Sequence, residues 1–205
     1  MTVQSEAESV LQFWFGPLQN GLMDPARRKA LFRSDSAFDA RIRREFGADM
    51  EAALAGERDH WSTTARGRAA LVLLLDQFTR NIFRGTPRAF GGDPQALAFA
   101  REGISRGEDQ LLALDNRVFF YLPFEHSESL ADQETRLTLF ESLLAAQEAG
   151  APAAEVARGY LRHARDHHAL IERFGRFPHR NRILNRKSTG EEQAWLEQDT
   201  RSFGQ

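Results

Sequence analysis

The chain has 205 residues, a formal net charge of −2 and no cysteine, and 41% of its residues are hydrophobic. A chain of this length buries roughly 70% of its unfolded surface, so it can form a full core without disulfides. The lack of cysteine excludes disulfide frameworks, thiolate metal sites and cysteine nucleophiles. The small net charge argues against a nucleic-acid binder that uses its whole surface. We expect one domain over residues 1–205, in which any anion site is local.

Neither a signal peptide nor a membrane span is visible in the sequence. The first residues lack a basic stretch and include Glu6 and Glu8. The longest apolar run, from Ala69 to Leu75, is far shorter than the ~20 residues that cross a bilayer. We therefore expect a cytoplasmic protein without membrane partners, and nothing in the sequence indicates its oligomeric state.

Apolar residues recur at helical spacing along almost the whole chain, and strand-like alternation is scarce. In chain order, helices are predicted over residues 5–15, 25–33, 36–46, 48–55, 64–82, 94–106, 115–122, 130–148, 153–174 and 190–199. Asp24 before Pro25, and Thr189 three residues before Glu192, are typical helix starts. The predicted fold class is all-α, with stacked antiparallel helix hairpins.

Single residues set some of these predicted boundaries. Gly47 is predicted to separate two neighbouring helices. Pro123 is predicted to end another helix, because the residue before a proline avoids the α region. The segment 64–82 is apolar nearly all round and too long for a strand, so it is predicted to be the central, buried helix.

Four polar residues interrupt this central helix. Asp76 and Arg80 are four residues apart, as are Gln77 and Asn81, so each pair shares a face of the helix. A buried polar group is costly unless it has a partner. The stripe therefore either lines a ligand cavity or forms an internal salt bridge that fixes helix packing, and the sequence leaves both interpretations open.

A second cluster follows an aromatic run. Residues 119–124 are expected to be plain core, and Glu125, His126, Ser127 and Glu128 come directly after them. Carboxylates and an imidazole at a helix end are suited to acid–base catalysis or to cation binding. Aromatic surroundings would raise the pKa of Glu125 if that carboxyl is buried. The alternative is that the two glutamates pair with arginines.

A third cluster lies on the predicted helix 153–174. His163 and His167 are four residues apart and share a face, as helical metal ligands must. Ala164 occupies the position of the catalytic glutamate of zinc metalloproteases, which excludes that class. Two histidines alone are a weak signal, so we predict no metal site and no cofactor, and keep His167 as a candidate acid–base residue.

Arginines are concentrated in the segment 173–187. This segment includes Arg176, Arg180 and Asn181, and Thr189 follows it at a predicted helix start. A guanidinium group binds carboxylate or phosphate through two parallel hydrogen bonds, and a helix N-terminus also favours an anion. The alternative is that these arginines neutralise the acidic residues of the other clusters.

The chain also resembles a known family. The resemblance is carried by four motifs, which run from Phe13 to Gly16, Leu75 to Ile82, Phe119 to Glu128 and Phe174 to Asn181. They are similar to those of the bacterial family catalogued as domain of unknown function 924. The resemblance implies a tetratricopeptide-like fold, with helix hairpins stacked in a right-handed arc, and no known activity. Asn185 stands where glycine is expected, and because asparagine tolerates the left-handed conformation, the turn should be kept.

The leading hypothesis is a protein that binds a small polar or anionic ligand, or the acidic end of a peptide. The reason is that many ionisable groups fall in or next to apolar segments. The predicted ligand-binding residues, gathered in one polar pocket, are Asp76, Gln77, Arg80, Asn81, Ser127, Arg176, Arg180 and Asn181.

The alternative from another class is a hydrolase. In that case Glu125 or Glu128 would be the general base and His126 or His167 its partner, with arginines as the anion clamp. No nucleophile elbow and no phosphate-binding glycine loop is visible, which ranks this hypothesis below binding. A weaker third hypothesis is RNA contact through residues 173–187, which the acidic remainder of the chain disfavours.

Overall fold

The computed structural model describes residues 3–198, with side chains from residue 5 onward. Regular structure in this range is helical, with no strand beyond a single bridge between Gln19 and Leu22. The predicted all-α fold class is therefore confirmed. No helix in the same range is both long and apolar enough to cross a membrane.

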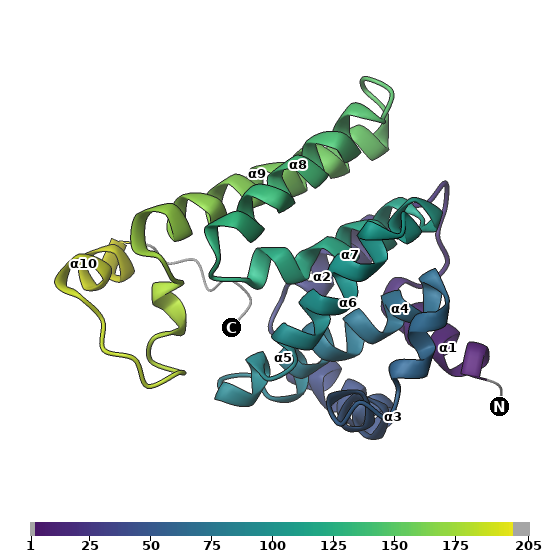
Figure 1. Ribbon diagram of the computed structural model, residues 1–205, viewed down its shortest axis with the longest axis horizontal. Helices are drawn as coiled ribbons and strands as arrows, with labels where there is room; N and C mark the ends of the chain where they lie inside the picture. Colours follow the sequence, from purple (N-terminus) through teal and green to yellow (C-terminus); the bar gives the residue numbers. More distant parts are fainter. Residues whose placement is uncertain (1–2, 199–205) are drawn as a thin grey trace. The chain divides into compact units, whose positions relative to one another are not determined.

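The described residues fall into two compact units. Unit 1 holds the residues up to 84 and residues 88–123, and unit 2 holds residues 85–87 and those from 124 onward. In Figure 1 unit 1 is coloured from purple to teal, and the part of unit 2 from residue 124 onward is coloured from green to yellow. Each unit has helices of its own and is described by itself. The single domain and the right-handed arc of hairpins stay predictions.

Unit 1 is built from short and medium-length helices. They are α1 (Val3–Phe15), α2 (Pro25–Leu31), α3 (Ser36–Leu54), α4 (Ala65–Val72), α5 (Thr79–Ile82), α6 (Asp93–Ser105) and most of α7 (Leu114–His126). The predicted start of α2 is confirmed, because Asp24 accepts a hydrogen bond from the backbone N–H of Arg27 at 2.9 Å and Pro25 is the first helical residue.

The centre of unit 1 is one continuous helical stretch. α4 passes into α5 through Leu73–Phe78, which are wound as a wider π-helix. The stretch from Ala69 to Ile82 is buried throughout, so the predicted central helix is confirmed. Aromatic rings pack against it: the Trp14 ring centroid lies 5.4 Å from that of Phe78.

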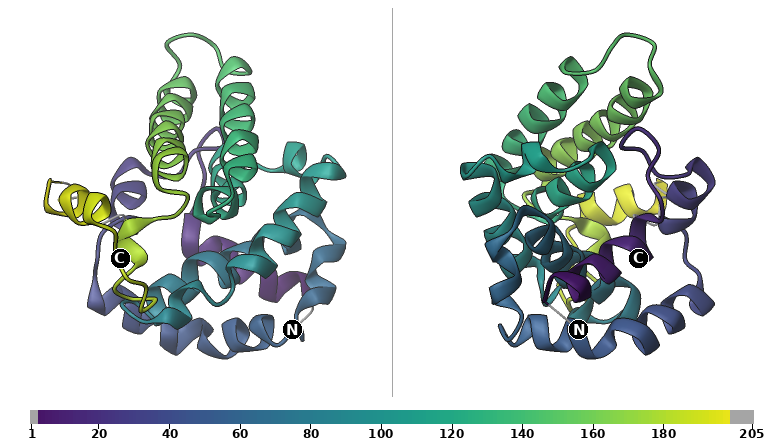
Figure 2. Two further views of the ribbon diagram at one scale, coloured as in Figure 1. Left: turned by 60° about the vertical axis from the view of Figure 1, so that its left-hand side comes forward. Right: turned by 90° about the vertical axis from the view of Figure 1, so that its right-hand side faces the viewer.

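Unit 2 contains the end of α7, then α8 (Leu130–Ala145), α9 (Pro152–Phe174) and α10 (Gly190–Gln198). α8 and α9 lie side by side as a hairpin, and α10 follows after an irregular segment (Figures 1 and 2). Gly175 ends α9 in the left-handed conformation, with φ of 66°. Asn185 has φ of 53°, which confirms that asparagine keeps the left-handed turn.

Two predicted helix boundaries are wrong. Gly47 lies inside α3. This helix buries one continuous face, which includes Ile42 and Phe46 before the glycine and Met50 after it. A single glycine costs only about 1 kcal/mol in a helix, so this burial outweighs it. Pro123 lies inside α7, which continues to His126.

The end of α7 beyond its proline is capped by a side chain. Gln133 Nε2, on α8, donates to the backbone oxygens of Phe124 at 3.0 Å, Glu125 at 2.9 Å and Ser127 at 2.7 Å. These carbonyls would otherwise lack partners at a helix end. A side chain that is distant in the sequence therefore stabilises a helical turn that local propensity disfavours.

Candidate functional site

The polar stripe of the central helix lies in unit 1 and takes part in ion pairs. Arg80 Nη1 lies 3.1 Å from Asp76 Oδ1 and 2.7 Å from Asp93 Oδ1, and its Nη2 donates to Asp93 Oδ2 at 3.0 Å. Gln77 Nε2 donates to Asp76 Oδ2 at 2.6 Å. Burial by itself lowers the pKa of Arg80, but the two carboxylates outweigh burial and raise that pKa. Arg80 is therefore held as a cation.

The rest of the stripe contacts α3. Asn81 Nδ2 donates to Asp39 Oδ1 at 2.7 Å. Arg84 donates to both Asp39 oxygens, at 2.8 and 3.0 Å. The predicted ligand-binding groups of unit 1 thus have protein partners from α3 and from the start of α6. For these residues an internal salt-bridge network fits better than a ligand cavity.

In unit 2, Glu125 lies between a buried arginine and a histidine. Arg136, on α8, forms an ion pair with Glu125, and His167 Nε2, on α9, lies 3.2 Å from Glu125 Oε1. Burial lowers the pKa of Arg136 well below its ordinary value. Burial, followed by the charge of Arg136, likewise lowers the pKa of His167.

Both ring nitrogens of His167 are occupied. Nδ1 lies 2.9 Å from the backbone oxygen of His163, which can only accept, so this nitrogen carries a proton. The other nitrogen faces Glu125. A general base must reach the proton that it abstracts from substrate. The predicted base, Glu125, has its Oε2 at Arg136 and its Oε1 at His167, so this arrangement disfavours the predicted hydrolase dyad. Among residues 3–198, no group of three or more His, Asp and Glu side chains is placed to hold a metal ion.

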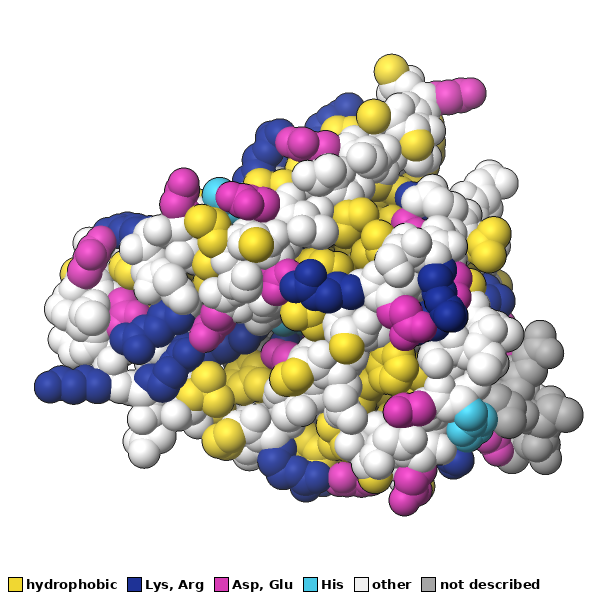
Figure 3. All heavy atoms as spheres, in the orientation of Figure 1, with side chains coloured by type: hydrophobic (Ala, Val, Ile, Leu, Met, Phe, Trp, Pro, Cys, Tyr) yellow, Lys and Arg dark blue, Asp and Glu magenta, His cyan; other side chains and the backbone are white. Residues whose placement is uncertain are grey.

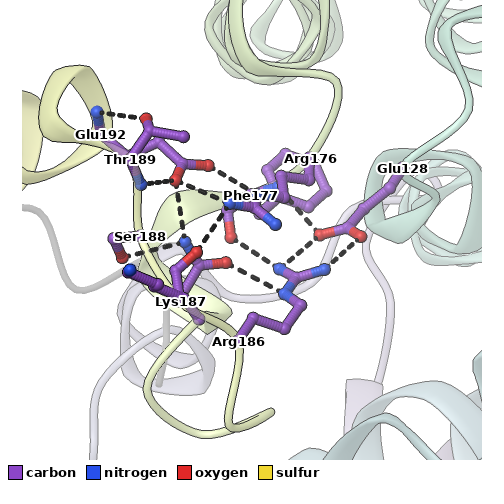
Figure 4. A network of polar contacts seen from close by, with 9 residues as sticks. Glu128, Arg176, Phe177, Arg186, Lys187, Ser188, Thr189 and Glu192 are labelled. Carbon is purple, nitrogen blue, oxygen red and sulfur yellow. Dashed lines mark hydrogen bonds and ion pairs between the residues drawn. The ribbon is translucent and has the colours of Figure 1, made fainter.

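Glu128 binds the segment that follows α9 through hydrogen bonds. Its Oε1 accepts from the backbone N–H of Phe177 at 2.8 Å, and both of its oxygens accept from Arg186, at 2.7 and 3.0 Å (Figure 4). Burial alone would raise the pKa of Glu128, but these hydrogen bonds outweigh burial and lower it. Of the two interpretations of Glu128, pairing with an arginine is the one that this geometry fits.

A second network surrounds Glu192 on α10. Arg176 donates to Glu192 Oε1 at 2.6 Å through Nε and to Oε2 at 2.8 Å through Nη2. Thr189 N–H donates to Glu192 Oε2 at 2.7 Å, and Glu192 N–H donates to Thr189 Oγ1 at 3.2 Å, which confirms the predicted capping box (Figure 4). Asn181 donates to Ser188 Oγ at 3.0 Å and to Glu192 Oε2 at 3.3 Å. Asn181 therefore supports the turn before α10.

The other predicted site residues of unit 2 make local contacts. Ser127 Oγ donates to Asp132 Oδ2 at 2.6 Å. Arg180 Nη1 donates to the backbone oxygen of His126 at 2.9 Å, and its guanidinium lies 4.5 Å from the ring centroid of Phe177. These contacts hold the end of α7 and the α9–α10 segment in place.

A hollow of about 340 Å³ lies between the C-terminal end of α9 and the N-terminal end of α10. We call it the α9–α10 hollow, and its lining residues are Arg173, Phe174, Arg176, Thr189, Glu191 and Glu192. Figure 3 shows Lys and Arg side chains gathered over the segment that joins these helices. Arg173 Nε donates to Glu191 at 2.8 Å, and both side chains are more than half exposed.

The structure brings some predicted residues together. Glu125 meets His167, and Glu128 and Asn181 share Arg186 as a partner, since Arg186 Nε donates to Asn181 Oδ1 at 2.9 Å. Arg176 and Asn181 share Glu192. Spacing along the sequence did not identify the residues that pair with the predicted site residues of the two units. These partners are Asp39 and Asp93 in unit 1, and Arg136, Arg186 and Glu192 in unit 2.

The model of a bacterial family of unknown function, DUF924, matches residues 10–200. The chain belongs to the DUF924 family. This confirms the resemblance drawn from the four motifs, and the match covers most of both units. Comparison of this DUF924 chain with curated proteins gives no match.

A solved structure is also similar to this DUF924 protein. It is that of a protein of unknown function from Agrobacterium tumefaciens, which is 40% identical in sequence, with a TM-score of 0.80. The match covers 97% of this chain and 100% of the other. The likeness therefore extends over nearly the whole DUF924 fold.

Proposed function

We propose that unit 2 binds the carboxylate or phosphate group of a small polar ligand in the α9–α10 hollow. The observation that carries the proposal is that Arg173, Arg176 and the start of α10 line one hollow of about 340 Å³. A guanidinium group recognises such anions through paired hydrogen bonds, and a helix N-terminus favours negative charge. A carboxylate or phosphate is therefore the chemistry that these groups recognise together.

The two arginines have different roles in this proposal. Arg176 is bound to Glu192, whose exposure is only 2%, so it stays in place as part of the wall. Arg173 pairs with Glu191, and their side chains are 53% and 61% exposed. An exposed pair of this kind contributes about 0–1 kcal/mol, so an incoming anion can displace Glu191 from Arg173.

The remaining wall supplies an apolar contact. The Arg173 guanidinium lies 4.7 Å from the ring centroid of Phe174, which is half-buried. A ring that lies under a guanidinium group orients the N–H donors of that group, and the face of the ring can contact the apolar part of a ligand. The proposed ligand thus combines an acidic group with a small body that contacts Phe174.

Of the residues in the predicted pocket, this proposal retains Arg176 as a ligand-binding residue and gives the others different roles. Asn181, Ser127 and Arg180 support the local fold through the contacts described above. The hydrolase alternative lacks support from His167, whose nitrogens are both occupied. RNA contact is disfavoured because Glu128, Glu191 and Glu192 offset the arginines of this segment. A cytoplasmic location stays a prediction.

The experiment that tests the proposal is a titration of the whole chain with inorganic phosphate and with citrate, followed by calorimetry at low salt. Arg173→Gln is expected to weaken binding by about fivefold or more, because it removes a charged donor. Arg165→Gln is the matched control, since Arg165 is an exposed arginine on the same helix that lies 3.5 Å from Glu141. Equal affinities of the two variants would overturn the proposal.

A second arm separates a small ligand from a peptide end. An N-acetylated acidic tetrapeptide is compared in two forms, with a free and with an amidated C-terminal carboxyl group. The proposal expects citrate or phosphate to bind at least as tightly as the free-acid peptide. Tighter binding of the peptide, lost on amidation, would replace the small ligand with a peptide end at the same site.

A further inference from the structure

Thr189 is the last residue of the irregular segment that precedes α10. Residues 186–189 of this segment have no regular structure, and Thr189 itself is exposed. Thr189 also lines the α9–α10 hollow, together with Arg173 and Arg176. Exposed irregular segments are the places where modifying enzymes most readily reach a chain, because little structure must open to let them in. Thr189 therefore combines an accessible hydroxyl group with a position on the wall of the proposed anion site.

Exposure separates Thr189 from the neighbouring hydroxyl group of Ser188 (Figure 4). Ser188 is half-buried, and its Oγ accepts a hydrogen bond from Asn181 Nδ2 at 3.0 Å. Thr189 Oγ1 accepts from the backbone N–H of Glu192 at 3.2 Å. A hydroxyl oxygen has two lone pairs, so this bond leaves one of them for a reaction at the exposed side chain. Of the two hydroxyl groups, that of Thr189 is the better acceptor for a transferred group.

Cations surround this hydroxyl group. Lys187, two residues earlier, is exposed, and Arg173 lines the same hollow as Thr189. A phosphate group on a threonine carries a charge of about −1.5 to −2 at pH ~7 and has three acceptor oxygens for arginine. Arg173 pairs with Glu191 through side chains that are 53% and 61% exposed, so a phosphate attached nearby can replace this glutamate.

We propose that Thr189 is a phosphorylation site, and that its phosphate group binds Arg173 and closes the α9–α10 hollow to free anions. This inference rests on the proposed function of that hollow. In the transfer, Thr189 Oγ1 attacks the terminal phosphorus of a nucleoside triphosphate. The bond from this phosphorus to the bridging oxygen breaks, a nucleoside diphosphate leaves, and the hydroxyl proton passes to a base of the kinase.

A phosphate that is attached to the wall competes strongly with a free anion. The attached group has an effective concentration on the order of millimolar or more at Arg173, and this concentration does not fall when the protein is diluted. Its negative charge also repels a second anion that enters the same hollow. Phosphorylation of Thr189 is therefore expected to inhibit ligand binding without the loss of any residue that contacts the ligand.

The experiment uses the whole chain, made with phosphothreonine in place of Thr189. Calorimetric titration with inorganic phosphate and with citrate should show binding about tenfold or more weaker than that of the unmodified chain. The matched control carries phosphothreonine in place of Thr138, an exposed residue on α8 whose hydroxyl donates to the backbone oxygen of Glu134 at 3.2 Å. The control should bind both anions as the unmodified chain does. Equal affinities of the chain phosphorylated at Thr189 and the unmodified chain would overturn the proposal.

The contact between the phosphate group and Arg173 is tested without any ligand. The change in melting temperature caused by phosphorylation of Thr189 is measured in the wild type and in Arg173→Gln. If the phosphate binds Arg173, this change should be more favourable in the wild type, because Arg173→Gln removes the cation. The same change in both backgrounds would contradict the contact.

The modification itself is tested by tandem mass spectrometry of the protein isolated from its own cells. The proposal expects phosphate on Thr189 and none on Ser188. Thr189 without phosphate in both growing and starved cells would overturn the modification. The two proposals for the hollow fail in different ways. If the unmodified chain binds no anion, the proposed function fails, whereas anion binding that phosphorylation of Thr189 leaves unchanged contradicts the present inference alone.

Discussion

Glu192 accepts hydrogen bonds from Arg176 Nε at 2.6 Å and from Arg176 Nη2 at 2.8 Å. The bond to Arg176 is the main reason that the pKa of Glu192 is lowered to about 2, although burial opposes the shift. The ordinary pKa of a glutamate is about 4.3, so the unfolded chain binds the proton more tightly. This interaction therefore stabilises the folded state above pH ~4.3, and the contribution is lost as the pH falls toward 2.

The first prediction concerns this acid dependence. Glu192→Gln cannot ionise, so its unfolding midpoint should lie below that of the wild type at pH 6, and the two midpoints should converge as the pH falls toward 2. Trp195 reports on unit 2, because it lies on α10 with its ring centroid 5.8 Å from that of Phe174. Fluorescence-detected thermal unfolding at pH values from about 2.5 to about 6 measures the effect. Parallel curves for the two proteins would contradict the assignment.

The second prediction concerns the start of α10. Thr189→Ala removes the side-chain acceptor of the Glu192 N–H, and it should lower the free energy of unfolding by about 0.5–2 kcal/mol. Thr189→Ser keeps the hydroxyl group and should retain most of that stability. Urea denaturation followed by Trp195 fluorescence gives both values. If serine were as destabilising as alanine, the loss would not come from the cap.

The third prediction concerns His179. Burial, followed by the neighbouring Arg180, lowers the pKa of His179 to about 3. The unfolded chain binds this proton with a pKa of about 6.5, so stability is complete above pH ~6.5 and is lost as the pH falls from there toward 3. His179→Gln removes this titration and should make the fall in melting temperature shallower over that range. His163→Gln, at an exposed position on α9, should leave the slope unchanged.

The fourth prediction concerns the central helix of unit 1. Arg80→Gln leaves Asp76 and Asp93 without their shared cation, and it should cost about 3–5 kcal/mol of unfolding free energy. Arg88→Gln is the matched control, because its pair with Glu51 is 59% and 50% exposed and should contribute less than about 1 kcal/mol. Urea denaturation compares the two. A small loss for Arg80→Gln would argue that the stripe is free to serve a ligand.

The fold could be predicted from the sequence where local pattern and burial agree. Residues 64–82 are apolar on all sides, and they form the buried helical stretch at the centre of unit 1. The prediction failed at Gly47 and at Pro123, where local propensity favours a break. At Gly47 a continuous buried face carries the helix on, and beyond Pro123 the helix end is capped by Gln133.

The candidate site was less predictable, for a physical reason. Sequence spacing identifies neighbours on one helix, such as Asp76 with Arg80 and the capping box of Thr189 with Glu192. It does not identify a partner that tertiary packing brings from another element. The pairing of Arg176 with Glu192, for example, joins the α9–α10 segment to α10 and leaves no trace in local spacing.

The central claim is that Glu191 pairs with Arg173 in the free protein and that a bound anion displaces Glu191 from this pair. The most direct measurement is the dissociation constant for phosphate of Glu191→Gln against the wild type, with Glu155→Gln as control. Glu155 is matched because its side chain is 62% exposed, against 61% for Glu191, and pairs with Arg158 on α9. The account predicts phosphate binding that is about two- to fivefold tighter in Glu191→Gln and unchanged in Glu155→Gln. Unchanged or weaker binding in Glu191→Gln would contradict it.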